Sequence, residues 1–62
     1  MKDELVKIYT MARILGVSIL WLRKETEEGR VPHLDADGDI LYSPEAVKAA
    51  LIELAQKGVV NA

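Results

Sequence analysis

Residues 12–32, ARILGVSILWLRKETEEGRVP, contain the signals of two short helices separated by a tight turn. Gly16 can adopt the left-handed backbone conformation that closes a helix. Ser18 can then accept hydrogen bonds from the free backbone N–H groups at the start of the next helix. Gly29 ends that helix. The stretch therefore predicts two helices joined by a turn, with the second helix over residues 19–28.

The predicted second helix has an inner and an outer side. If Leu22 faces inward, the 3.6-residue period turns a set of mainly polar residues outward. This set consists of Ser18, Ile19, Leu20, Arg23, Lys24 and Glu27. A DNA-binding helix lays such a face in the major groove, with its first residues near the base edges and its basic residues near phosphates. The alternative is an ordinary helical hairpin with a solvated outer face.

Length and composition restrict the class of protein. Residues 1–62 are expected to form one domain whose core is too small for a deep catalytic cleft, so an enzyme is not expected. The chain has no cysteine and one histidine, and neither a metal site nor a cofactor is predicted. No apolar run approaches the roughly 20 residues of a membrane span, and the start MKDE lacks the order of a signal peptide. We expect a cytoplasmic protein without a membrane partner.

The net charge of −2 argues mildly against nucleic acid, because affinity for nucleic acid depends largely on neutralising phosphates. The charges are unevenly distributed, however. Residues 7–34 carry a balance of +2, and residues 35–62 carry a balance of −3. Any basic surface is therefore expected on the first two helices.

Residues 1–6 are predicted to be a frayed lead-in to a first helix over residues 8–15. Thr10 is one candidate for the N-cap of this helix, and a start near Lys7 is equally consistent with the sequence.

A short hairpin is predicted after the second helix. The Asp-Gly pair at 37–38 favours a two-residue turn with positive φ at both central residues. In that register Leu34 faces Leu41 and His33 faces Tyr42, so that one face of the hairpin can lie on the helices.

A third helix begins at Ser43 as N-cap and Pro44 as first helical residue, and Gly58 ends it. Residues 59–62 are expected to be a tail whose valines contribute to a small contact surface. The buried stripe of the helix is predicted to consist of Val47, Ala50, Leu51 and Leu54. The whole is a mainly α fold with a small β-hairpin (α+β), in which a two-stranded wing lies between the second and third of three helices.

This order of elements resembles the excisionase-type helix-turn-helix family, which is related to the DNA-binding domains of MerR-like regulators. The resemblance covers about residues 7–56. Its most specific parts are Leu15-Gly16-Val17-Ser18, the ten residues 19–28, Gly29-Arg30-Val31-Pro32, and Tyr42-Ser43-Pro44-Glu45-Ala46-Val47.

The resemblance implies a winged helix-turn-helix that binds double-stranded DNA as a regulator or as an accessory factor in recombination. It places Ser18, Ile19, Leu20, Arg23, Lys24 and Glu27 on the DNA-facing side of the second helix, with Arg30 and His33 beside the wing. Because this chain has few cations, tight binding is expected to need a homodimer, tandem sites or a partner such as a recombinase or another co-encoded protein.

The chain departs from the family pattern at several positions. Ile19 and Leu20 stand where polar or basic residues are common, and they can contact only thymine methyl groups. Position 25 is commonly a bulky apolar residue. Here it is Glu25, in an acidic run that we interpret as a solvated helix end, with Trp21 filling the apolar space as partly buried core. The wing, usually basic, carries Asp35, Asp37 and Asp39.

These departures support a second hypothesis, a protein-interaction module on the same fold. Its contact surface would combine an exposed patch of Ile19, Leu20 and Trp21 with the acidic wing. For His33, packing on Tyr42 is favoured over contact with a phosphate.

The three wing aspartates also resemble the first half of a calcium loop. Ile40 and Ala46 occupy the positions where an EF-hand needs glycine and a bidentate glutamate, so a solvated acidic tip is expected. Whether this tip binds a cation is left open.

Overall fold

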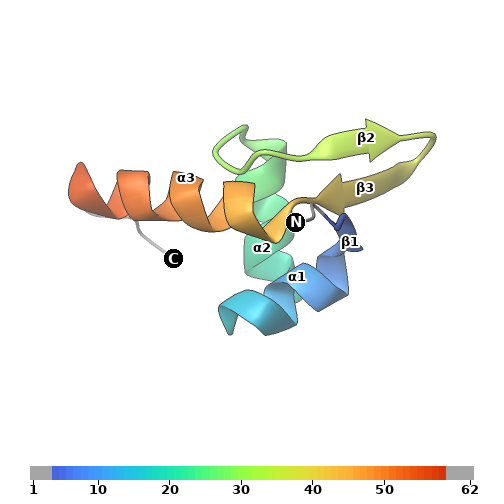
Figure 1. The fold of residues 1–62 in the computed structure, drawn as a ribbon, viewed down its shortest axis with the longest axis horizontal. Coiled ribbons are helices and arrows are strands. Elements are labelled where there is room, and N and C mark those ends of the chain that lie inside the picture. Colours follow the sequence, from blue (N-terminus) through green and yellow to red (C-terminus); the bar gives the residue numbers. More distant parts are fainter. Residues whose placement is uncertain (1–3, 59–62) are drawn as a thin grey trace.

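The computed structural model describes residues 4–58, which form three helices and a three-stranded antiparallel sheet (Figure 1). The α+β class predicted from the sequence is therefore confirmed. In chain order, the elements are β1 (Val6–Lys7), α1 (Ile8–Leu15), α2 (Ile19–Glu27), β2 (Leu34–Ala36), β3 (Asp39–Tyr42) and α3 (Pro44–Gln56).

The turn between α1 and α2 has the predicted chemistry. Gly16 closes α1 with φ 76°, a left-handed conformation that side chains rarely adopt. Its backbone N–H donates to the Ala12 carbonyl oxygen over 2.8 Å. The Ser18 hydroxyl oxygen then caps α2 by accepting from the Trp21 N–H over 3.0 Å. Of the two predicted starts of α1, the one near Lys7 is correct, because Lys7 is the N-cap residue and Thr10 lies inside the helix.

The sheet is larger than predicted, because part of the supposed lead-in is a strand. The strand order is β1-β3-β2, and Val6 of β1 is paired with Tyr42 of β3. The prediction that residues 1–6 form only a lead-in, and that the hairpin has no third strand, was therefore wrong at Val6. Two extended residues are enough because β3 offers them an unpaired edge.

The hairpin between β2 and β3 has the predicted register, with Leu34 opposite Leu41. Its turn residues Asp37 and Gly38 both have positive φ, 56° and 91°, as a type I′ turn requires. The predicted pairing of His33 with Tyr42 was wrong, because the paired residues of β2 begin at Leu34 and His33 lies before the strand.

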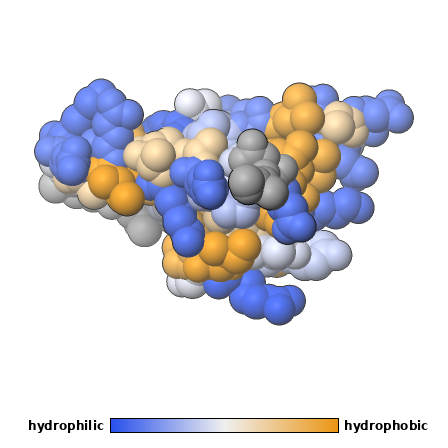
Figure 2. Space-filling model, in the orientation of Figure 1, coloured by the Kyte–Doolittle hydropathy of each residue, from blue (hydrophilic) through white to orange (hydrophobic). Residues whose placement is uncertain are grey.

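The two faces of the sheet differ in what covers them. Ile40 and Tyr42 point toward the helices and pack in the core. Leu34 and Leu41 point the other way and, with Leu5, line a shallow hollow of about 200 Å³. Figure 2 shows a hydrophobic patch over the hairpin. Leu34 is one of the exposed large hydrophobic residues.

One buried cluster joins the helices to the sheet. It consists of Met11, Ala12, Leu22, Val31, Tyr42 and Val47. Two buried hydroxyl groups, those of Thr26 and Tyr42, form a hydrogen bond with each other. The Thr26 hydroxyl lies 2.8 Å from the Tyr42 hydroxyl and 2.8 Å from the Leu22 carbonyl oxygen. The end of α2 is thus fastened to β3 by a hydrogen bond inside the core.

The helix α3 starts as predicted, with the Ser43 hydroxyl oxygen accepting from the Ala46 N–H over 3.4 Å and Pro44 in the first turn. The helix ends at Gln56, with Lys57 as its C-cap residue and Gly58, at φ 137°, directly after it, so the prediction that Gly58 ends the helix is confirmed. Figure 1 shows its second half extending away from the rest of the fold. Consequently only Val47 of the predicted stripe is fully buried, and Ala50, Leu51 and Leu54 are half-buried. The predicted tail, residues 59–62, lies outside the described residues.

Candidate functional site

The outer face of α2 carries two exposed cations. Leu22 and Thr26 are buried on its inner side, so the helical period places Leu20, Arg23 and Lys24 in solvent. Within residues 4–58, neither Arg23 nor Lys24 takes part in an ion pair. Both positive charges are therefore available to an anionic partner.

The remaining predicted residues of α2 surround these cations. Ser18 and Glu27 are exposed at its two ends, and Leu20, at 76% exposure, is the most exposed of the large hydrophobic residues described. Ile19 is also exposed. Trp21 is half-buried and packs against the core, with an indole N–H that is buried and has no hydrogen-bond partner within residues 4–58. The apolar patch of the second hypothesis therefore rests mainly on Ile19 and Leu20.

Arg30 lies beside α2, but its charge is already matched. Its Nε donates to Oε1 of Glu25 over 2.5 Å, and its Nη2 donates to Oε2 of Glu25 over 3.0 Å and to Oε1 of Glu28 over 2.6 Å. The Glu25 side chain is only 3% exposed. The interpretation of this acidic run as a solvated helix end was therefore wrong for Glu25. The Gly29 turn brings the guanidinium of Arg30 back onto the helix, and this allows a carboxylate to be buried there.

This pairing shifts the titration of both partners. The hydrogen bond from Arg30 lowers the pKa of Glu25 below its ordinary value of 4.5, against the opposing effect of burial. The hydrogen bonds to Glu25 and Glu28 raise the pKa of Arg30. Arg30 is thus a fixed partner of Glu25 and offers less charge to an external ligand than Arg23 or Lys24.

His33 is exposed at the start of the hairpin. Its Nδ1 lies 2.9 Å from the Val31 carbonyl oxygen, so this ring nitrogen donates if it carries the proton. Tyr42, on which the imidazole was expected to pack, is fully buried and is hydrogen-bonded to Thr26 instead.

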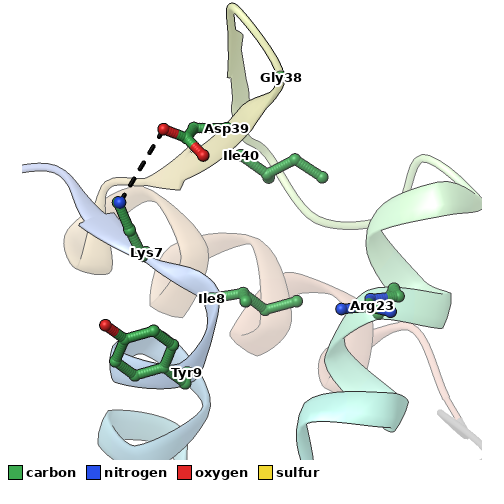
Figure 3. A pocket seen from close by; sticks show the side chains of 7 residues that line it. All are labelled: Lys7, Ile8, Tyr9, Arg23, Gly38, Asp39 and Ile40. Atoms are coloured by element: carbon green, nitrogen blue, oxygen red, sulfur yellow. Dashed lines mark ion pairs between the residues drawn. The ribbon is translucent and has the colours of Figure 1, made fainter.

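A groove that was not predicted opens between α2 and the sheet. Its volume is about 210 Å³, and it is lined by Lys7, Ile8, Tyr9, Arg23, Gly38, Asp39 and Ile40 (Figure 3). Across its mouth, Nζ of Lys7 lies 3.9 Å from Oδ2 of Asp39. No pattern in the sequence indicates this groove, because Lys7 and Tyr9 reach it only through the pairing of β1 with β3.

The acidic hairpin does not assemble into a metal site. Among residues 4–58, no group of three or more His, Asp or Glu residues is arranged to hold a metal ion. Asp35 is paired with Ile40, whereas Asp39 lies on the Lys7 side of the sheet, and Asp37 is in the turn. In a calcium loop, carboxylates at alternate positions converge on one ion. In this hairpin the three aspartates lie on two strands and in the turn between them, so their carboxylates do not converge.

Comparisons with models of known protein families, with curated proteins and with solved structures find no match. None of the helices in the described part of the chain is long and apolar enough to span a membrane. Function is therefore inferred from the geometry and charge of the site.

Proposed function

We propose that α1, α2 and the β2–β3 hairpin form a winged helix-turn-helix of the excisionase-like class, and that α2 binds duplex DNA in the major groove. The observation that carries the proposal is that Arg23 and Lys24 are exposed on the outer face of a capped helix and have no ion-pair partner among residues 4–58. A cation that is not matched within the protein can neutralise a phosphate or donate to a guanine edge. No chemical step is involved.

The proposed binding is weak for a single copy, because contact of only Arg23 and Lys24 with phosphates releases few counterions. A homodimer, tandem DNA sites or a recombinase partner would add the missing contacts. The role is that of a transcription regulator or a recombination accessory factor. Ser18 at the N-terminus of α2 is placed to approach a phosphate, and Ile19 and Leu20 are placed to contact thymine methyl groups.

The proposal is tested by measuring fluorescence anisotropy of labelled duplex DNA at several salt concentrations. Arg23→Ala combined with Lys24→Ala should lower affinity about tenfold at low salt and reduce the slope of log K against log salt by about 2. The matched control is Lys48→Ala with Lys57→Ala, which removes the same charge from exposed positions near the two ends of α3.

If both double variants weaken binding equally, only net charge matters and α2 is not the contact surface. If the wild-type protein does not bind duplex DNA at low salt, the proposed function fails.

The second candidate, a protein-interaction module, is favoured by the exposure of Leu20. A large apolar side chain in solvent, here in the first turn of α2 beside the exposed Ile19, is typical of contact surfaces. Association with a co-encoded protein that is lost in Leu20→Asp, but retained in the Arg23/Lys24 double variant, would select this function over DNA binding.

A further inference from the structure

We propose that the groove between α2 and the sheet binds a phosphate of the DNA backbone, and that Asp39 occupies this site as a competing carboxylate in the free protein. The inference rests on the proposed function and adds Lys7 and Tyr9 to the surface. Neither residue belongs to α2 or to the hairpin.

The walls of the groove are lined by charged and polar side chains. Figure 3 shows Arg23 on α2 at one side of the groove and Lys7 and Tyr9 at the other, with Asp39 above Lys7. Two cations, one phenol and one carboxylate line the groove, so its lining carries a net charge of +1. Tyr9 is 58% exposed, which leaves its hydroxyl free to donate to an incoming oxygen.

The groove also has an apolar part, made by Ile8 and Ile40 between the charged walls. A phosphodiester combines charged oxygens with the CH groups of the flanking sugars, and it matches this mixture better than a free anion does. Arg23 belongs both to the outer face of α2 and to the groove. A duplex lying on α2 would therefore bring a backbone segment over the groove.

The contact of Asp39 with Lys7 is weak enough for a phosphate to displace it. This contact is long, at 3.9 Å, and the two side chains are 57% and 64% exposed. Exposed ion pairs of this kind are weak and are screened by salt. An arriving phosphate can therefore replace the carboxylate as the partner of Lys7, although it is repelled by Asp39 until the carboxylate turns away.

The test compares two substitutions that remove the same charge from the same hairpin. Asp39→Asn removes the competitor and should raise the affinity for duplex DNA about fivefold at low salt. Asp35→Asn is the control, because Asp35 is paired with Ile40 but does not line the groove, and it should change affinity less than twofold. In a Lys7→Ala background, the gain from Asp39→Asn should shrink to the size of the control.

Equal gains from Asp39→Asn and Asp35→Asn would overturn the inference and leave the proposed function standing, provided that the Arg23/Lys24 double variant still weakens binding. A separate arm titrates inorganic phosphate while recording amide NMR signals of residues 7–9 and 38–40. If free phosphate shifts these signals at low millimolar concentration while duplex DNA is not bound, the groove is a small-anion site and its assignment to DNA is overturned.

Discussion

Replacing Arg30 with alanine should lower the midpoint of thermal unfolding by roughly 10 °C or more. The substitution leaves the Glu25 carboxylate buried at 3% exposure, without either of the hydrogen bonds that the guanidinium donates. An unpaired buried charge is among the most destabilising changes that one substitution can make. Thermal unfolding followed by circular dichroism at pH 7 measures the effect.

The matched control is Glu25→Leu, which removes the buried charge and keeps Arg30 paired with Glu28 at the surface. Because a hydrophobic residue can replace a buried ion in a well-packed site, Glu25→Leu should be nearly neutral or stabilising. Arg30→Lys should resemble Arg30→Ala more than the wild type, since an ammonium cannot form the two-pronged contact. Equal losses in Arg30→Ala and Glu25→Leu would contradict this account.

Lowering the pH should change the contribution of Glu25 to stability in opposite directions in the wild-type protein and in Arg30→Ala. In the wild-type protein the pKa of Glu25 is lowered on folding, so the stabilisation from this group is present above pH 4.5 and is lost as the pH falls through the folded pKa. Without Arg30 the burial of the carboxyl, which raises its pKa, is opposed only by the smaller coulombic effect of Lys24, and protonation then relieves the destabilisation. The difference in unfolding midpoint between the two proteins should therefore narrow as the pH falls, first above pH 4.5 as the variant is relieved and then below pH 4.5 as the wild type loses its stabilisation. A difference that is constant from pH 7 to pH 3 would exclude this role for Glu25.

Much of the fold could be predicted from the sequence, because its helix boundaries are set by local chemistry. Gly16, Ser18 and Ser43 act through their own backbone or their nearest N–H groups, and no distant residue is needed to interpret them. The Asp37-Gly38 turn is local in the same sense, and it fixes the hairpin register. The outward placement of Arg23 and Lys24 follows from the helical period alone.

Two of the features that the sequence did not indicate, the strand β1 and the groove, depend on contacts between distant segments, whereas the burial of Glu25 depends on a nearby turn. Strand β1 is too short to show an alternating pattern, and its partner β3 lies beyond both α1 and α2 in the chain. The groove depends on this pairing, so Lys7 was not expected near Asp39. Glu25 was misassigned because an acidic run at a helix end is usually solvated, and only the turn at Gly29 brings Arg30 back to cover it.

Thr26 and Tyr42 share one hydrogen bond, but removing the Thr26 hydroxyl should lower the free energy of unfolding more than removing the Tyr42 hydroxyl. The Leu22 carbonyl oxygen can only accept, so the Thr26 hydroxyl uses its single hydrogen there, and Tyr42 must therefore be the donor to Thr26. Thr26→Val leaves a buried tyrosine donor without an acceptor, and should cost roughly 1–3 kcal/mol. Tyr42→Phe leaves only an unused acceptor on Thr26, and should cost roughly 0.5–1.5 kcal/mol.

The double variant, Thr26→Val with Tyr42→Phe, identifies the cause of this asymmetry. It removes both polar atoms and leaves neither a buried donor nor a buried acceptor, so it should be more stable than Thr26→Val alone. Urea unfolding of the four proteins gives the coupling free energy, with an unchanged m-value as the check that the native fold is kept. Additive costs would mean that the two hydroxyls do not interact. A larger loss in Tyr42→Phe than in Thr26→Val would reverse the assigned donor, and α2 would then be fastened to β3 by a hydrogen bond donated from the helix.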